Sequence, residues 1–316
     1  MEAPREREEL TLVVRRPCFG LPTACPSCLP VYFYLKFSGF PFQLEFNLIH
    51  PDSDQIPYIE SDSYVAYNNE KGGVIESLKD DGILDMDSEL WSTPDFTSMK
   101  AMIGSWLENA LQYELWLGSD GSSVQKIYYA DLPWPLGKIL HLKQIRMVKQ
   151  HLGITKEHAE RREAEIYQKA MIAYGALSTS LGEEEFFFNR PSSLDAAFLG
   201  HALIVLQALP ETSPLRSKLS QYDNLVRYAE KHKAQYIDTS SISSPQFPSF
   251  PKRGSKPKGA AKKERTPEEK KFRKRAKYFL IAQFVAALLF LTIMGGPFDN
   301  NELEMDDEDQ GFSYDD

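Results

Sequence analysis

Two cysteines with a spacing that supports redox chemistry stand near the start of the chain. Cys25-Pro26-Ser27-Cys28 is a C-x-x-C sequence just before a segment with a helical pattern. A helix N-terminus lowers the pKa of a thiol and favours the nucleophilic thiolate. Cys25 and Cys28 are therefore candidate redox residues. The loop of residues 17–30 carries four prolines and is longer than a thioredoxin turn. That favours the alternative, in which Cys28 is a small apolar side chain of the core.

The other residue types that support catalysis or metal binding form no recognisable site in the sequence. The histidines have no spacing typical of a metal site, with one another or with the cysteines: His50, His141, His151, His158, His201 and His232. Phosphate-binding, serine-hydrolase and zinc-protease motifs are absent as well. We therefore predict no catalytic residue, no metal site and no cofactor.

Charge is arranged in blocks along the 316 residues, which the formal net charge of −9 hides. Residues 1–251 carry 23 basic and 33 acidic side chains, and residues 252–277 carry 13 basic and 3 acidic ones. Residues 278–296 are uncharged, and residues 297–316 carry 9 acids and no base. The 42% hydrophobic content excludes a wholly disordered chain, and three cysteines exclude a disulfide scaffold.

The uncharged block has the length of a membrane-spanning helix. Its 19 residues would form a helix about 28 Å long, close to the roughly 30 Å hydrocarbon core of a bilayer. The predicted anchor side chains are Tyr278, Phe279, Leu280, Phe284, Val285, Leu288, Leu289, Phe290, Leu291 and Ile293. The basic flank before them consists of Lys270, Lys271, Arg273, Lys274, Arg275 and Lys277. Because basic flanks face the cytosol, we predict a single-pass tail anchor with a cytosolic N-terminal body.

The basic belt, residues 252–277, also matches the charge of a nucleic-acid-binding segment. Its only aromatic side chain is Phe272, so it offers bases almost nothing to stack on. We therefore expect the belt to contact anionic lipid headgroups and predict no nucleic-acid partner. The acidic body suggests a second hypothesis, in which it attracts basic presequences. Ordinary solubility is the alternative explanation.

The first 90 residues alternate between strand-like and helix-like patterns. Strands are expected at residues 10–15, 42–48, 56–59 and 64–67, and helices at residues 31–40, closing on Gly39, and 73–79. The order strand–helix–strand–strand–strand–helix is that of a thioredoxin-like domain.

The next 150 or so residues are helical in pattern. Apolar stripes predict five helices, at residues 96–117, 135–151, 156–181, 191–209 and 214–236. The predicted domains are therefore thioredoxin-like (1–90), all-α (91–238), a disordered basic linker (239–267), a juxtamembrane and transmembrane helix (268–296) and an acidic tail (297–316).

Two local motifs resemble a known family. Ser192 and Asp195 form a capping box after an apolar run, as glutathione-transferase-like folds have deep in their helical domain. The segment of residues 20–39 contains Gly-Leu-Pro-Thr, Cys-Leu and Tyr-Leu-Lys-Phe, and so resembles the opening of metaxins. Together with the tail anchor, the chain is similar to plant-type metaxins over about residues 10–235.

This resemblance implies a glutathione S-transferase-like fold and a non-enzymatic import protein of the mitochondrial outer membrane. The implied partners are mitochondrial precursor proteins, subunits of the β-barrel assembly complex and the lipid bilayer. The alternative is a tail-anchored glutathione- or thiol-dependent enzyme that uses Cys25 and Cys28. A glutathione site would need the Ile56-Pro57 bond in cis and an acid–serine pair near Glu70, where Lys71 replaces the serine. We expect a structural cis-proline without ligand.

Overall fold

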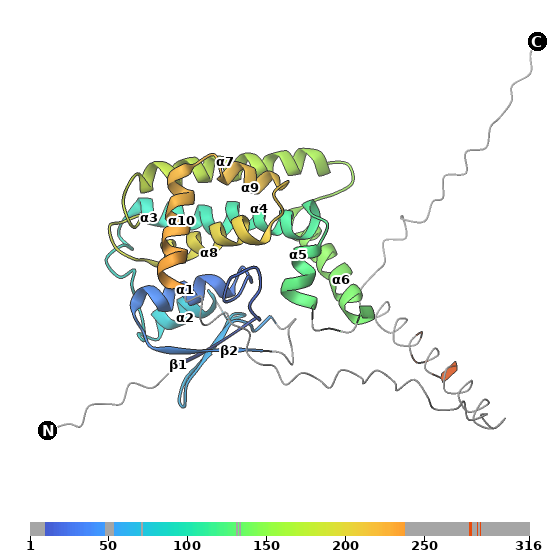
Figure 1. Cartoon of the computed structure of the whole chain (residues 1–316), viewed down its shortest axis with the longest axis horizontal. Coiled ribbons are helices and arrows are strands. Elements are labelled where there is room, and N and C mark those ends of the chain that lie inside the picture. The colour runs from blue at the N-terminus through green and yellow to red at the C-terminus, as the bar shows by residue number, and fades with distance from the viewer. Residues whose placement is uncertain are drawn as a thin grey trace, which may run out of the picture. The chain divides into compact units, whose positions relative to one another are not determined.

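Every helix and strand labelled in Figure 1 belongs to one unit, Met1–Phe247; the second unit is Pro248–Asp316. The computed structural model describes residues 10–47, 54–70, 72–130, 132 and 134–237, and in the second unit residues 278, 279, 283 and 285.

A four-stranded sheet in the order β2-β1-β3-β4 forms one layer of the first unit. Its strands are β1 (Leu10–Val14), β2 (Phe42–Phe46), β3 (Tyr58–Glu60) and β4 (Val65–Tyr67). β1 pairs parallel to β2 and antiparallel to β3, and β3 pairs antiparallel to β4. The Leu- and Val-rich sequence of β1 suits this central place, because a strand with neighbours on both edges and covered faces is apolar along most of its length. The four predicted strands are confirmed to within two residues at their ends.

Helix α1 (Cys28–Ser38) connects the two parallel strands. It begins three residues earlier than predicted, because Pro30 falls in its first turn, where backbone N–H groups have no partner within the helix. Gly39 ends the helix as predicted, with a left-handed φ of 64° that a residue without a side chain adopts at no cost. The second helix of this layer, α2 (Gly73–Asp80), follows the β3–β4 hairpin.

The second layer is helical, and α1 and α2 lie between it and the sheet (Figure 1). Its elements, with three π-helical turns labelled η, are α3 (Pro94–Met102), η1 (Ile103–Leu107), α4 (Glu108–Tyr113), η2 (Glu114–Gly118), α5 (Ser122–Val124), η3 (Gln125–Tyr129), α6 (Trp134–Leu152), α7 (Ala159–Leu181), α8 (Ser193–Ala208), α9 (Pro214–Leu219) and α10 (Asp223–Tyr236). The predicted helix at 96–117 is one continuous helical run, α3 through η2. The sequence pattern missed α5 and η3.

The predicted helix at 214–236 is wrong, because the chain breaks it into α9 and α10. Leu215 and Leu219 are fully buried on α9, and Leu225 is fully buried on α10. At 100° per residue, a straight helix would place Leu225 about 120° around the axis from Leu219, away from the buried side of α9. The non-helical backbone at Tyr222 (φ −111°, ψ 86°) redirects the chain so that both segments bury their apolar side chains.

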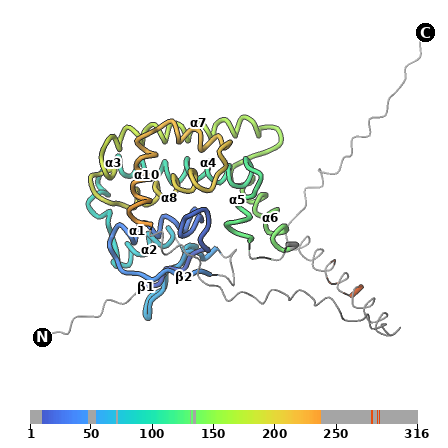
Figure 2. The backbone as a smooth tube through the Cα atoms, in the orientation of Figure 1, coloured from blue at the N-terminus to red at the C-terminus, as the bar shows by residue number. Residues whose placement is uncertain are grey.

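Helix α8 is the centre of the first unit, and Figure 2 shows its backbone passing between α1 and α7. All but two of its sixteen residues are buried. It packs against α1 so closely that a Cβ on Gly200 would lie 2.9 Å from Cγ of Pro30 and 3.1 Å from its backbone nitrogen. Glycine at position 200 therefore permits the close contact between the two layers, because the rigid ring of Pro30 cannot move aside.

This close contact gives a prediction whose sign opposes helix propensity. Gly200→Ala should destabilise the protein by about 1–3 kcal/mol through overpacking against Pro30. The matched control is Gly104→Ala, because Gly104 is exposed in a helical run and its added Cβ has no atom within 4 Å apart from the backbone of its own helix and its chain neighbours. That control should be neutral or stabilising by up to about 1 kcal/mol. Denaturant unfolding of both variants in mild detergent measures this, and a stabilising Gly200→Ala would contradict the packing argument.

Candidate functional site

The C-x-x-C pair lies at the junction of a loop and the first turn of α1. Cys28 is the first residue of the helix, and its backbone N–H donates to the carbonyl of Cys25 over 3.1 Å. The backbone N–H of Cys25 donates to Oγ1 of Thr23 over 3.3 Å. Only 2% of Cys25 and 0% of Cys28 is exposed. Both thiols are free, and neither is open to solvent.

Arg15 completes this cluster from the end of β1. Its side chain is buried, and the guanidinium carbon lies 4.6 Å from the ring centre of Tyr128, which belongs to η3. Burial alone would raise the pKa of the Cys25 thiol. The hydrogen bond with Cys28 and the positive charge of Arg15 outweigh it and lower the pKa to about 6. Burial and the neighbouring Cys25 raise the pKa of Cys28 instead.

The geometry favours a structural ion pair over a reactive dithiol. A thiolate at Cys25 would offset part of the desolvation cost of the buried Arg15 charge. Element η3 covers the loop before α1, with Nζ of Lys126 placed 5.1 Å from the ring centre of Phe19. A thiol enzyme needs its thiolate in contact with substrate, and the folded chain encloses this one.

Sequence reasoning missed Arg15 and Tyr128. A basic residue directly after a buried strand, as Arg15 follows Val14, was the available signal for the first. Tyr128 had none, because the turn that carries it was not predicted.

The positions considered for glutathione are only partly described. The Ile56-Pro57 bond is cis, and Ile56 is buried. Oε2 of Glu70 accepts a hydrogen bond from Oγ of Ser77 over 3.4 Å. Lys71 lies outside the described residues.

The capping-box residues lie in a buried network at the start of α8. Oγ of Ser192 accepts from the backbone N–H of Asp195 over 3.4 Å and donates to its carboxylate over 2.5 Å. The other carboxylate oxygen accepts from the N–H of Phe187 and the hydroxyl of Tyr228, each over 3.1 Å. Burial raises the pKa of Asp195 to about 6, against these donors. The carboxylate thus ties α8 to the preceding loop and to α10.

A second buried carboxylate joins the two layers. Asp87 is fully buried; it pairs with Nζ of Lys79 on α2 over 2.6 Å and accepts from the N–H of Ser193 on α8 over 2.8 Å. Lys79 also contacts Oε1 of Glu76 over 3.0 Å. Burial opposes ionisation of Asp87, but the ammonium of Lys79 and the donors of Ser193 hold its pKa below the usual value. The sequence pattern gave no sign of this cluster.

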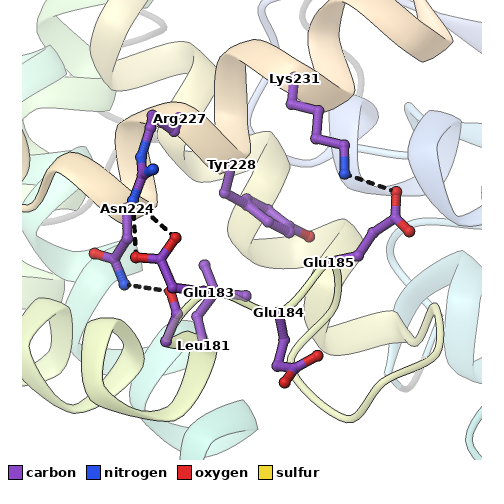
Figure 3. Close-up of a pocket in the computed structure, with 9 residues that line it drawn as sticks. Leu181, Glu183, Glu184, Glu185, Asn224, Arg227, Tyr228 and Lys231 are labelled. Carbon is purple, nitrogen blue, oxygen red and sulfur yellow. Dashed lines mark hydrogen bonds and ion pairs between the residues drawn. The ribbon is translucent and has the colours of Figure 1, made fainter.

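A surface depression of about 240 Å³ lies where the loop after α7 meets α10 (Figure 3). Four of its charged side chains form two pairs: Arg227 with Glu183 over 3.0 Å, and Lys231 with Glu185 over 2.9 Å. Both basic side chains of this lining are therefore paired with carboxylates, which leaves the depression no free cation to hold an anionic ligand. Within the described residues, no group of histidine, cysteine and carboxylate side chains could hold a metal ion.

The membrane prediction falls almost entirely outside the described residues. Tyr278, Phe279 and Val285 are helical and exposed. The other anchor residues lie outside the description: Leu280, Phe284, Leu288, Leu289, Phe290, Leu291 and Ile293. So do all six residues of the basic flank: Lys270, Lys271, Arg273, Lys274, Arg275 and Lys277. In the part of the chain that is described, no helix has both the length and the apolar character to cross a bilayer.

Comparisons with known proteins matched two family models and a set of curated relatives. Residues 26–121 match the family model described as glutathione S-transferase N-terminal domain, and residues 170–232 match the C-terminal one. The chain is 57% identical to the "Mitochondrial outer membrane import complex protein METAXIN" of Arabidopsis thaliana, over 98% of this chain and all of that one. Metaxin-1 of Mus musculus is 28% identical over 66% of this chain and 69% of its own.

Solved structures of similar fold are more distant. Glutathione transferase GSTFuA3 of Phanerochaete chrysosporium has a TM-score of 0.46 at 12% identity and covers 73% of this chain and 98% of its own. The β-etherase LigF of Sphingobium has a TM-score of 0.44 at 15% identity, over 74% and 98%.

The cluster around Asp87 generates a stability prediction. Asp87→Asn should cost about 3 kcal/mol, because it removes the carboxylate that balances the buried Lys79. Arg227→Gln is the control; its exposed pair with Glu183 should matter by less than about 1 kcal/mol.

The pH dependence of that loss has a defined sign. Because the folded pKa of Asp87 is lowered, its contribution is complete above about pH 4 and disappears as pH falls through the folded value. Unfolding of both variants in mild detergent across this pH range tests the argument. An Asp87→Asn loss no larger than the control's, or one unchanged in acid, would contradict it.

Proposed function

The chain belongs to the metaxin family, and on this premise we propose that it acts in protein import and assembly at the mitochondrial outer membrane. Its role is that of a non-enzymatic subunit or receptor, which handles precursor proteins together with the β-barrel assembly complex. The 57% identity to a metaxin over nearly the whole chain carries this proposal.

The buried thiols support a non-enzymatic role. The alternative enzyme would use Cys25 and Cys28, and the lowered pKa of Cys25 is the observation in its favour. A thiolate acts on a substrate only where the substrate reaches it, and these side chains are 2% and 0% exposed. The hydrogen bond with Cys28 and the charge of Arg15 give the lowered pKa a structural explanation.

The proposed topology is a tail anchor at residues 278–296, with the body in the cytosol. The uncharged length of this segment and the basic flank before it support that arrangement. We also propose that the domain boundaries lie at residues 90, 238 and 267. A basic belt next to an anchor would contact anionic headgroups, at about 1 kcal/mol for each nearby base.

Extraction of mitochondria with mild detergent and native electrophoresis tests the proposed function. The chain should migrate in a large complex together with a β-barrel core protein, whereas a tail-anchored enzyme should migrate alone. Cys25→Ala with Cys28→Ala separates the two functions, because it removes the thiols and should leave the large complex intact if the protein folds. A chain that migrates alone, or a complex whose import role requires both thiols, would contradict the proposal.

The same membranes test the anchor by alkaline carbonate extraction. The wild-type chain should stay in the membrane fraction. Ala287→Arg with Leu289→Arg should release it, because two central arginines add roughly 5–7 kcal/mol to insertion. Retention of the double variant would show that the span lies elsewhere.

A further inference from the structure

Helix α6 is a basic helix in an acidic body. Its 19 residues include Lys138, Lys143, Arg146 and Lys149 and no aspartate or glutamate. The segment of residues 1–251, which contains it, has 23 basic and 33 acidic side chains. All four basic side chains of α6 are exposed. The helix therefore presents a positive surface that the body as a whole does not share.

Large apolar side chains stand among these bases. Leu136, Leu142 and Met147 are 45%, 60% and 50% exposed. Leu142 has Arg146 four residues on and Lys149 seven residues on, so these three side chains share one stripe of the helix surface. Scattered exposed leucines are common on proteins, but here three occur on one helix beside its bases.

Another side of α6 accounts for its attachment to the body. Val148 and Leu152 are 4% and 1% exposed, and the helix contacts α4, η2 and η3. Figure 1 shows α6 at the edge of the helical layer, beyond α5. Because the core contacts use one side, the exposed leucines and methionine are not needed for packing within the body.

We propose that the exposed face of α6 lies on the surface of a bilayer that contains anionic lipids. Lysine and arginine side chains at such a surface extend their charges toward phosphate headgroups while their methylene stems cover apolar surface. Leucine and methionine side chains between them enter the boundary between headgroups and acyl chains. This contact rests on the proposed function only in that the chain works at a membrane.

A bilayer fits this face better than a dissolved polyanion does. Nucleic acid or an acidic protein segment would pair with the four bases and leave Leu142, whose side chain is 60% exposed, in water. An interface that offers both negative charge and an apolar layer satisfies both kinds of side chain.

A fluorescent probe on the full-length chain tests this contact. In a Cys18→Ser background, Leu142→Cys carries an environment-sensitive nitrobenzoxadiazole label, while the buried Cys25 and Cys28 stay unlabelled. Ile172→Cys is the matched control, since Ile172 is 52% exposed on α7, where Glu165 pairs with Arg162 and Lys169. Each labelled chain is reconstituted into vesicles of phosphatidylcholine, with or without phosphatidylinositol.

The label at position 142 should become brighter and blue-shifted in the vesicles that contain phosphatidylinositol, and the label at position 172 should not change. Salt at about 1 M, where the screening length is ~3 Å, should reverse the shift. Lys143→Gln with Lys149→Gln should weaken the contact about 30-fold, at about fivefold for each base removed. Arg227→Gln with Lys231→Gln removes the same charge from α10 and should have no effect.

Several outcomes would overturn the proposal. Equal emission at position 142 in both kinds of vesicle would exclude recognition of anionic lipid. An equal shift at position 172 would show a general effect of the membrane on the body. The same shift produced by RNA or an acidic polypeptide without vesicles would make α6 a polyanion site. None of these bears on whether the chain migrates with a β-barrel core, so failure here leaves the proposed function to its own test.

Discussion

A positive charge buried at the end of β1 is the main electrostatic constraint on the C-x-x-C site. Moving a guanidinium out of water is costly unless an opposite charge and hydrogen bonds compensate it. In this chain, Cys25 lies beside Arg15 and Tyr128 lies under its guanidinium. The hydrogen bond with Cys28 and the charge of Arg15 lower the pKa of Cys25, and a thiolate there would in turn offset the buried charge of Arg15. A lowered thiol pKa, which in an open site indicates reactivity, here reports an internal ion pair.

The two layers are joined by contacts that depend on Asp87 and Gly200. Asp87 connects the loop after α2 to the start of α8, and Gly200 lets α8 approach Pro30 of α1. Because these contacts are buried and specific, the layers behave as one unit rather than as a mobile pair. Such a unit suits a protein that presents fixed surfaces to other components, and it leaves the basic outer face of α6 free of core packing.

Local patterns predicted the elements well where the apolar periodicity was strong or a glycine marked the end of a helix. Alternation identified the strands, and Gly39 identified the end of α1. The break between α9 and α10 was missed because Ser220 and Tyr222 carry no helix-stopping signal; the break follows from which side faces the core. The sequence pattern also missed element η3, and with it Tyr128. Arg15 and Asp87 act through partners distant in sequence, which no local pattern can supply. Most of the anchor, which the length and the charge pattern of residues 278–296 predicted, lies outside the described residues.

The rate at which each thiol is alkylated in the folded full-length chain tests most directly the claim that the thiol site is closed. Iodoacetamide treatment in mild detergent, followed by peptide mass spectrometry, resolves the three cysteines. The account predicts that Cys18, which is partly exposed, reacts first. Cys25 and Cys28 should react only as fast as the chain unfolds, and denaturant should accelerate them. Rapid modification of Cys25 in the folded protein, at the rate expected for an accessible thiol with a pKa of about 6, would contradict the account.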